Sequence, residues 1–331
     1  MKTISIVNPC YNEQENVMEV YERVKQVMRK LSCYRYEHIF IDNASTDGTV
    51  EVLRYIARVD KNVKVIVNSR NFGHVRSPVH GVFQARWDAV AVFATDLQEP
   101  PELLKEMIHK WENGTPIVIA IKEASDENRL AFWMRRRYYR LIKRLSATET
   151  YEDFTGFGLY DRKVVDILKG FDDPYPYFRG MIAEIGLPHL ELSYHQQRRK
   201  RGKTKNNLYT LYDLAMLGIT NLSKVPLRLV TFTGFISSLV CVLVALVYFV
   251  YKLLFWDRFS VGMAPLVIGI FFFSSVQLLS LGIIGEYIGA IHTQVQRRPL
   301  VVERERINFE HAPGEPLAES PVEAKATERG S

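Results

Sequence analysis

Two long apolar segments near the carboxyl end constrain this sequence more than any other feature. Residues Leu229–Phe255 contain one charged residue, Lys252, and residues Pro265–Ile291 also contain one, Glu286. Each segment exceeds the roughly 20 residues that an α-helix needs to cross the hydrocarbon core of a bilayer. The sequence therefore predicts a transmembrane hairpin of two helices within residues 229–298. Two helices buried in a soluble core are the alternative.

The connection between the two apolar segments is short, so both flanks of the hairpin must lie on one side. Basic residues gather at this shared side, whereas the connection itself offers only Arg258. The flanking basic residues are Lys224, Arg228, Arg297 and Arg298. Because basic flanks stay in the cytoplasm, we expect a multi-pass protein of the cytoplasmic membrane, with its amino-terminal domain and both termini cytoplasmic.

The region before the hairpin alternates short apolar runs with amphipathic segments. The apolar runs are typical of buried strands: ISIVNP, EHIFID, VKVIVN, AVAVFAT and PIVIAI. This alternation predicts an α/β domain over residues 1–205, with a parallel sheet wound by helices. We expect the amphipathic juxtamembrane segment, residues 206–228, to lie in the membrane interface. Residues 299–331 are predicted to form a cytoplasmic tail, largely disordered because it has few large apolar residues.

The charge balance favours anionic partners. The 331 residues have a formal net charge of +6, which suits a phosphorylated ligand, a nucleic acid or the anionic face of a membrane. The basic run Arg135–Arg144 is either a solvated helix face or a contact with membrane lipids, and membrane anchoring argues against nucleic acid. The three cysteines show neither metal-binding spacing nor a disulfide framework, which favours a reducing compartment.

Polar side chains follow three of the predicted strands at their carboxyl ends. They are Asn12 and Glu13 after the first strand, Asp42 after the second and Asp96 after the fourth. Because the carboxyl ends of parallel strands line one ligand crevice, we expect Asn12 and Asp42 to face the same crevice. Helix capping is the alternative for Asn12 and Glu13. Capping is the favoured interpretation for the polar residues of the second loop, Ser45, Thr46 and Asp47.

Asp96 is a candidate metal ligand. A lone carboxylate at the end of a strand can hold a hard cation such as Mg²⁺ or Mn²⁺, which often takes one or two carboxylates together with the phosphates of a substrate. A turn-forming aspartate is the alternative. Pro100 and Pro101, a few residues further on, suit the first turn of a helix.

Five short motifs follow one another along the chain: PCYNE, IDNASTDGT, SRNFGH, TDLQEPPELL and RKRGKTKNN. In this order they resemble the family-2 glycosyltransferases. The resemblance is strongest to the polyprenyl-phosphate glycosyltransferases, such as dolichyl-phosphate mannose synthase and the bacterial undecaprenyl-phosphate glucosyl and aminoarabinosyl transferases. It implies a GT-A nucleotide-sugar fold, a divalent metal (Mg²⁺ or Mn²⁺), and inverting transfer of a sugar from a nucleotide to a lipid phosphate. Several members are tetramers, so a homo-oligomer is expected.

The resemblance also assigns roles to individual residues. Asp42 matches the acid that contacts the nucleobase or ribose, and Asp96 matches the last acid of a D-x-D motif, which holds the metal. Gln98 follows Asp96 in the same loop. The other nucleotide-sugar-binding positions are Pro9, Tyr11, Asn12, Glu13 and Ser45. An R-x-x-G-x-[ST]-K element that binds the lipid phosphate is matched by Arg199, Gly202, Thr204 and Lys205.

Three acids that many members carry are missing from this chain. Asn43 replaces the second acid at the end of the second strand, and Ala94 replaces the first acid of D-x-D. Many members also carry an acid in a later T-G-D-F element, where this chain has DFTGFGLYDR with its acid displaced to Asp153. The metal role of Asp96 survives these changes. The sugar contacts of the missing acids, and with them the identity of the donor sugar, stay open.

The expected function is transfer of a hexose from a UDP-sugar to undecaprenyl phosphate on the cytoplasmic face, for modification of a cell-envelope glycan. A phosphate monoester carries about −1.5 to −2 charge and needs no strong general base. A metal on Asp96 would neutralise the leaving nucleoside diphosphate, while Arg199 and Lys205 hold the acceptor phosphate.

Two alternatives to this function stay open. A polysaccharide synthase usually has further transmembrane spans and a Q-x-x-R-W element, whereas the run QQRRKRG lacks the tryptophan. A degenerate, non-catalytic protein that binds lipid phosphate or scaffolds partners would account for the missing acids.

Overall fold

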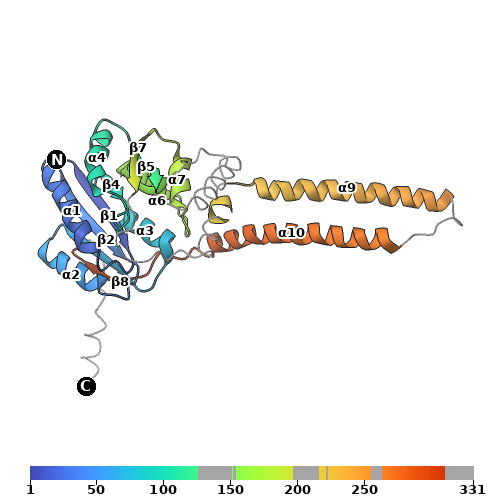
Figure 1. Cartoon of the computed structure of the whole chain (residues 1–331), viewed down its shortest axis with the longest axis horizontal. Helices are drawn as coiled ribbons and strands as arrows, with labels where there is room; N and C mark the ends of the chain where they lie inside the picture. The colour runs from blue at the N-terminus through green and yellow to red at the C-terminus, as the bar shows by residue number, and fades with distance from the viewer. Residues whose placement is uncertain (126–150, 152–153, 197–215, 221–222, 255–262, 310–331) are drawn as a thin grey trace, which may run out of the picture.

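The computed structural model describes residues 1–125, 151, 154–196, 216–220, 223–254 and 263–309. In this part of the chain, an α/β domain carries two long helices that extend from it side by side (Figure 1). The segment that follows the second helix returns to the α/β domain. The molecule therefore has an α/β head and a helical stalk.

A mixed sheet forms the centre of the α/β domain. Its described strands follow the order β7-β5-β6-β4-β1-β2-β3-β8. The parallel part consists of β4 (Ala89–Val92), β1 (Thr3–Cys10), β2 (Arg35–Asp42) and β3 (Val63–Asn68). Next to it, β6 (Phe154–Asp161) runs antiparallel to β4 and to β5 (Ile117–Ser125), and β7 (His189–Gln196) is parallel to β5. The predicted parallel sheet is correct for β1 to β4. The sequence analysis did not predict β6, which inserts antiparallel beside β4.

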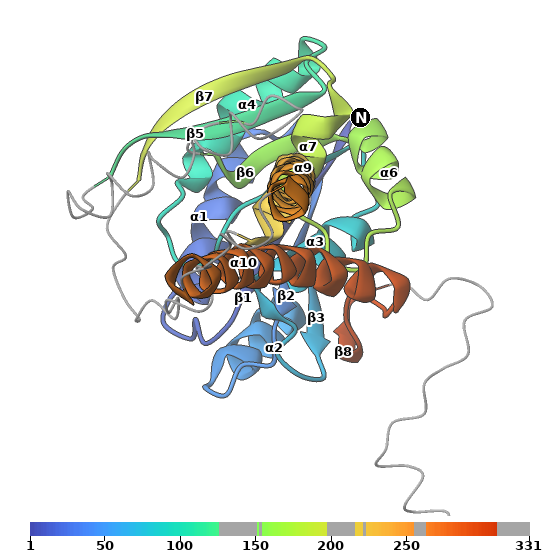
Figure 2. The same ribbon diagram turned by 90° about the vertical axis from the view of Figure 1, so that its right-hand side faces the viewer.

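Helices cover both faces of the sheet (Figure 2). One face is covered by α1 (Val17–Lys30), α2 (Thr49–Val59) and α4 (Leu104–Glu112). The other face is covered by α3 (Gly73–Gln84), α6 (Arg162–Gly170) and α7 (Phe178–Ile185). Alternation along β1 serves the two cores, since Ile4 and Ile6 face the first and Val7 faces the second. As the two prolines predicted, a helical turn begins at Pro101 and leads into α4.

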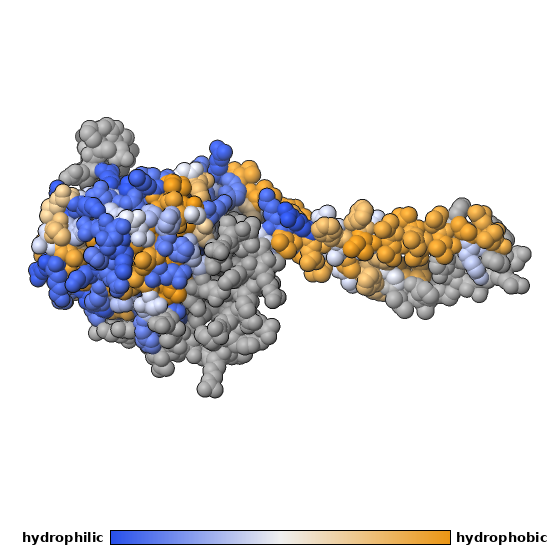
Figure 3. All heavy atoms as spheres, turned by 90° about the horizontal axis from the view of Figure 1, so that it is seen from above, coloured by the Kyte–Doolittle hydropathy of each residue, from blue (hydrophilic) through white to orange (hydrophobic). Residues whose placement is uncertain are grey.

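Two exposed apolar helices leave the α/β domain, as Figures 1 and 3 show. They are α9 (Val225–Leu254) and α10 (Met263–Val295). Among the described residues, each helix has a stretch long and apolar enough to cross a bilayer. Their large side chains face outward, with Phe232 67% exposed and Phe271 70% exposed. The alternative of two helices buried in a core is therefore wrong for this chain.

Hydrogen bonds join the carboxyl-terminal end of α10 to the α/β domain and to the residues just before α9. The Tyr287 hydroxyl donates to the Ser223 carbonyl at 2.6 Å, just before α9 begins. The Gln294 side-chain amide donates to Asp173 Oδ1 at 2.7 Å, in the loop before α7. Beyond the end of α10, Arg76 of α3 donates to the Pro299 carbonyl. The helices therefore leave from the side of the domain that carries α3 and α7.

After α10 the chain adds a last strand to the sheet. Residues Glu303–Ile307 form β8, antiparallel to β3 at the sheet edge. Arg54 of α2 binds Glu305 at 2.6 Å, and His80 of α3 lies 2.5 Å from Glu303, so both faces hold the strand. The prediction assigned all of residues 299–331 to a tail. The difference arises because a charged run such as ERERI lacks the apolar pattern of a strand, although it can pair at an exposed edge.

Candidate active site

The loops after β1 and β2 are joined by hydrogen bonds. The Asn12 backbone N–H donates to Ser45 Oγ at 2.8 Å, and the Thr46 backbone N–H donates to Asn12 Oδ1 at 2.7 Å. Asn12 has a left-handed backbone, with φ 55°, which asparagine tolerates better than most residues. The two strand ends predicted to share a crevice do meet, and Asn12 and Ser45 make the contact.

Asp42 lies beneath this contact and is fully buried. Its carboxylate accepts hydrogen bonds from the backbone N–H of Ser45, at 2.9 Å, and from the Ser45 hydroxyl. Burial raises the pKa of Asp42, and the hydrogen bonds from Ser45 oppose that shift. Asp42 therefore shapes the loop that presents Ser45, and its contact with a nucleobase or ribose stays a prediction.

Helix capping explains less of these loops than the sequence indicated. α1 begins at Val17 with Asn16 as its cap residue, so neither Asn12 nor Glu13 caps it. In the second loop Asp47 does bind the first turn of α2, since its Oδ1 accepts from the Thr49 N–H at 3.1 Å. Ser45 instead bonds back toward the strand ends.

The other residues predicted to bind the nucleotide occupy the same loop in different ways. Pro9 lines the cavity described below, and its carbonyl accepts a hydrogen bond from the Thr95 hydroxyl at 2.9 Å. Tyr11 is partly buried. Glu13 is buried, and its backbone N–H donates to the Thr49 hydroxyl at 2.9 Å. Glu13 therefore supports the loop from below.

The loop after β4 alternates buried and partly exposed side chains. Thr95, Leu97 and Glu99 are buried, whereas Asp96 and Gln98 reach the surface. Leu97 adopts a left-handed backbone, with φ 62°, and its side chain enters the core. The Gln98 N–H donates to Asp96 Oδ1 at 3.2 Å, which closes a turn. Asp96 therefore forms a turn and also presents its carboxylate at the carboxyl end of the sheet.

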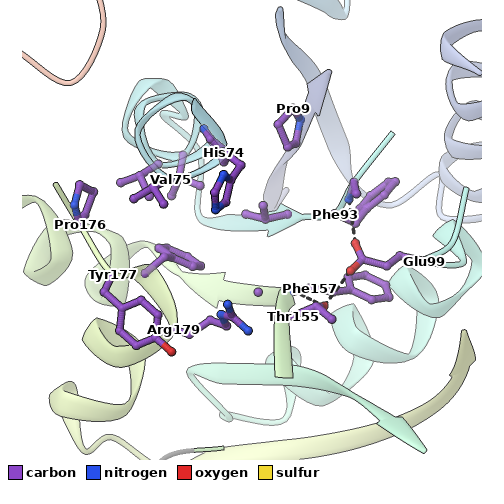
Figure 4. Close-up of a pocket in the computed structure, with 17 residues that line it drawn as sticks. Pro9, His74, Val75, Phe93, Glu99, Thr155, Phe157, Pro176, Tyr177 and Arg179 are labelled. Atoms are coloured by element: carbon purple, nitrogen blue, oxygen red, sulfur yellow. Dashed lines mark hydrogen bonds between the residues drawn. The ribbon is translucent and has the colours of Figure 1, made fainter. Parts of the chain in front are cut away.

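Glu99 was not among the predicted site residues. Its side chain is 6% exposed, and its two oxygens accept from the Ala94 backbone N–H and the Thr155 hydroxyl, each at 2.7 Å (Figure 4). Burial raises the pKa of Glu99 to about 7, and nearby Asp96 adds to the shift, although both hydrogen bonds oppose it. In the sequence, an acid directly before two prolines resembles an ordinary helix-start residue, so the signal was weak.

A cavity of ≈190 Å³ lies beside Glu99 (Figure 4). Its walls come from the ends of β1 and β4, the start of β6, most of the length of α3 and the segment that leads into α7. The lining is mainly apolar, and its side chains with polar groups are His74, Glu99, Thr155, Tyr177 and Arg179. An apolar cavity with a few converging polar groups is the usual form of a small-molecule site. Because it adjoins the Asp96 loop, we take this cavity as the candidate active site.

Asn43, which stands where many members have an acid, is held as a neutral amide. Its Oδ1 accepts from the Phe72 N–H at 2.8 Å and from the Asn68 side chain at 3.2 Å. Its Nδ2 donates to Asn71 Oδ1 at 2.9 Å and to the Gly73 carbonyl at 3.1 Å. A carboxylate could not make the last two bonds, so the loop before α3 requires an amide at this position.

The predicted lipid-phosphate site lies outside the described residues. It comprises Arg199, Gly202, Thr204 and Lys205. The basic run Arg135–Arg144 and the displaced acid Asp153 also lie outside. Their roles stay predictions.

Comparison with known proteins assigns the chain to an enzyme class. The profile of glycosyl transferase family 2 matches residues 5–168, which include the strand-end loops and the cavity wall from β6. The chain belongs to this family and is a transferase with a GT-A-like mixed sheet, as the motifs predicted.

Individual relatives match over almost the whole chain. The chain is 35% identical to an uncharacterized glycosyltransferase of Bacillus subtilis, over 93% of this chain and 95% of that protein. It is 31% identical to the SfII prophage-derived bactoprenol glucosyl transferase of Shigella flexneri, over 89% of this chain and 96% of that protein. It is 30% identical to a prophage bactoprenol glucosyl transferase homolog of Escherichia coli, with the same coverage.

Proposed function

We propose that this protein transfers a hexose from a UDP-sugar to a polyprenyl phosphate at the membrane surface. One observation carries the proposal. The short segment Tyr175–Arg179 lies between two cavities: Tyr177 and Arg179 line the active-site cavity, whereas Tyr175 lines a second cavity against α10, together with Glu286. A nucleotide sugar in the first cavity and a lipid beside α10 would thus be near neighbours.

The relatives support the same acceptor. Those named bactoprenol glucosyl transferases match the apolar helices as well as the α/β domain, since the similarity covers 89% of this chain. Bactoprenol phosphate is a polyprenyl phosphate, so we extend this acceptor to the present chain. UDP is favoured over other nucleotides on the family resemblance.

The two apolar helices would anchor the enzyme in the cytoplasmic membrane. Because β8 follows α10 and pairs with β3, both ends of the helix pair lie at the α/β domain. This arrangement supports a hairpin whose ends face one side, and the basic residues that flank it favour the cytoplasm. Assembly into a homo-oligomer, such as a tetramer, remains part of the proposal on resemblance alone.

The residues fit a divalent cation if the substrate completes its ligand set. Among the described residues, no three His, Cys, Asp or Glu side chains cluster as a metal site, but Asp96 presents an oxygen ligand at the carboxyl end of the sheet. One carboxylate together with substrate phosphates suits Mg²⁺ or Mn²⁺. A cation held by Asp96 would offset the negative charge of the leaving nucleoside diphosphate.

The protein's own groups would orient the two substrates. The nucleotide would bind over the contact between Asn12 and Ser45, with Tyr11 and Gln98 as further contacts. Arg199 and Lys205, with Thr204, would hold the acceptor phosphate in line with the sugar and reduce the repulsion between two anions. The acceptor phosphate needs no protein base, because it is already ionised at neutral pH.

The test is to incubate purified protein with UDP-glucose, undecaprenyl phosphate and Mn²⁺, and to analyse the lipid fraction by mass spectrometry. We expect one hexose on each product lipid. Longer glycans would favour a polysaccharide synthase. Binding of undecaprenyl phosphate without turnover of UDP-glucose, UDP-galactose or UDP-N-acetylglucosamine would favour the non-catalytic alternative.

A further inference from the structure

Two of the missing acids belong to strand ends that line the active-site cavity. One position is Ala94, at the end of β4, and the other lies in the element around Thr155, at the start of β6. The family resemblance gives these acids contacts with the donor sugar. A functional site in this chain must therefore contact the sugar through other groups.

Glu99 brings one carboxylate to both of these strand ends. Its Oε2 accepts from the Ala94 N–H and its Oε1 accepts from the Thr155 hydroxyl, each at 2.7 Å. Figure 4 shows the side chain spanning from the turn before α4 to the start of β6, at the rim of the cavity. A residue from outside both strands thus supplies the acid that each of them lacks.

The carboxylate of Glu99 has hydrogen-bonding capacity beyond these two contacts. Each carboxylate oxygen has two lone pairs, and each receives one hydrogen bond from the described residues. The side chain of Glu99 is only 6% exposed. In the described part of the chain, no lysine, arginine or histidine forms an ion pair with it. A buried carboxylate that lacks a cation is costly unless other donors reach it. Hydroxyl groups of a ligand in the cavity would be such donors.

The remaining walls of the cavity suit a sugar ring. Phe157 and Tyr177 offer apolar surface to its C–H faces, and Figure 4 shows Tyr177 and Arg179 across the cavity from Glu99. Arg179 is held in position by a hydrogen bond from Nη1 to the Phe154 carbonyl at 3.1 Å. A sugar combines apolar C–H groups with hydroxyl donors, so it matches an apolar cavity that has an acid at one side.

We propose that Glu99 binds hydroxyl groups of the transferred sugar and thereby determines which sugar the enzyme accepts. This inference rests on the proposed function, because it requires a nucleotide sugar in the cavity. The competing explanation is that Glu99 only bridges the turn before α4 to β6. The two explanations differ in the effect of a substitution that keeps the bridge.

Glu99→Gln is that substitution. Its amide oxygen can still accept from the Ala94 N–H, and its NH₂ group can donate to the Thr155 hydroxyl, which accepts as well as donates. The bridge is kept, whereas the charge and an acceptor for sugar hydroxyls are lost. Glu102→Gln is the matched control, because it makes the same change at an exposed acid three residues further on, which does not line the cavity.

Isothermal titration calorimetry of the full-length protein with Mn²⁺ would compare UDP-glucose with UDP, which lacks the sugar. We expect Glu99→Gln to weaken the binding of UDP-glucose by about tenfold more than the binding of UDP. This is the usual loss for a hydrogen bond to a charged group. Glu102→Gln should change both affinities by less than about threefold, because the Glu102 side chain is exposed and pairs with Arg23 away from the cavity.

Equal weakening of UDP-glucose binding and UDP binding by Glu99→Gln would overturn the inference, and so would a Glu102→Gln variant with the same selective loss. Either result leaves the proposed function intact if wild-type protein binds UDP-glucose and transfers its sugar. Wild-type protein that binds neither UDP-glucose nor UDP would overturn the proposed function, and the inference with it.

Discussion

Asn43 and Ala94 both stand where an acid is usual in the family, but the structure explains them differently. At Asn43 the surroundings require an amide, because Nδ2 donates to Asn71 Oδ1 and to the Gly73 carbonyl. At Ala94 the backbone N–H binds the carboxylate of Glu99, so an acid from elsewhere in the sequence reaches the position. Loss of an acid from a motif is therefore weak evidence for loss of activity in this chain.

The first prediction concerns the amide at position 43. Asn43→Asp should lower the free energy of unfolding by about 1–3 kcal/mol, because a carboxylate cannot donate to the Gly73 carbonyl and would face it in a buried site. Chemical denaturation of detergent-solubilised protein measures the change. Asn113→Asp, at an exposed position, is the control. Equal stability of Asn43→Asp and wild type would show that the amide is not required.

The second prediction concerns the metal. Asp96→Asn should reduce transfer at least ~100-fold, because it removes a carboxylate proposed to bind the cation, while the turn with Gln98 can still form. Activity at graded Mn²⁺ concentrations, with thermal unfolding as the folding control, tests this. Full wild-type activity in excess chelator would contradict a metal role.

The third prediction uses the raised pKa of Glu99, about 7 against an ordinary 4.5. Between these values the folded protein holds a proton that the unfolded chain has released, so stability falls as pH rises from 4.5 to 7 and is level above. Asp96 adds to the shift, and Tyr160 and Tyr194 lie close enough to sense Glu99. Relative to Glu99→Gln, the free energy of unfolding of the wild type should fall by up to about 3 kcal/mol between pH 4.5 and pH 7.

Unfolding free energies of both proteins, measured in chelator at several pH values, test this prediction. Parallel curves for wild type and Glu99→Gln would mean that Glu99 titrates at its ordinary pKa.

Individual residues show which parts of the site could be predicted from the sequence and which could not. Asn12, Asp42 and Asp96 were predicted at strand ends because apolar runs show where a strand stops. Glu99 was missed because its environment depends on Thr155, a residue far along the chain. β6 inserts antiparallel beside β4, and nothing in the local pattern of either segment specifies that pairing.

Among the elements, β8 departs most from the sequence-based expectation. Arg54 and His80 bind this strand from its two sides. Burial alone would raise the pKa of Glu303, but hydrogen bonds from Arg306 and His80 lower it to about 2. Asn308 closes the strand by donating to the carbonyls of Ala57 and Val63. Strand prediction depends on alternating or continuous apolar residues, and a charged edge strand has neither.

The fourth prediction tests this strand with two truncations. Deleting residues 300–331 removes β8 and leaves the edge of β3 unpaired, so Tm should fall by more than about 5 °C and the protein should aggregate. Deleting residues 310–331 keeps β8 and should leave Tm unchanged. Thermal unfolding and size-exclusion chromatography compare the two. Identical behaviour of both truncations would show that β8 contributes nothing to stability.

For the whole molecule, the arrangement of head and stalk implies one orientation. The start of α9 and the end of α10 lie at the α/β domain, while the end of α9 and the start of α10 lie far from it (Figure 1). Because basic residues near the head favour the cytoplasmic side of a membrane, we predict a cytoplasmic head. The connection should therefore be outside.

The fifth prediction tests that orientation. In a Cys241→Ser background, an impermeant thiol reagent should label Ser260→Cys in intact cells. The native Cys33, which is exposed on the α/β domain, should react only after the cells are broken. Reaction of Cys33 in intact cells without reaction at position 260 would reverse the topology.

The position of β8 also fixes an order of assembly. A ribosome completes β1, β2 and β3 early, but it releases the partner of β3 only after both apolar helices have been synthesised. Until then β3 is an unpaired edge strand in the nascent domain, and such a strand can pair with other chains. The sheet can close only if the second helix ends on the side where the first one began. If α9 and α10 insert into a membrane as proposed, completion of the enzyme's fold depends on their correct insertion.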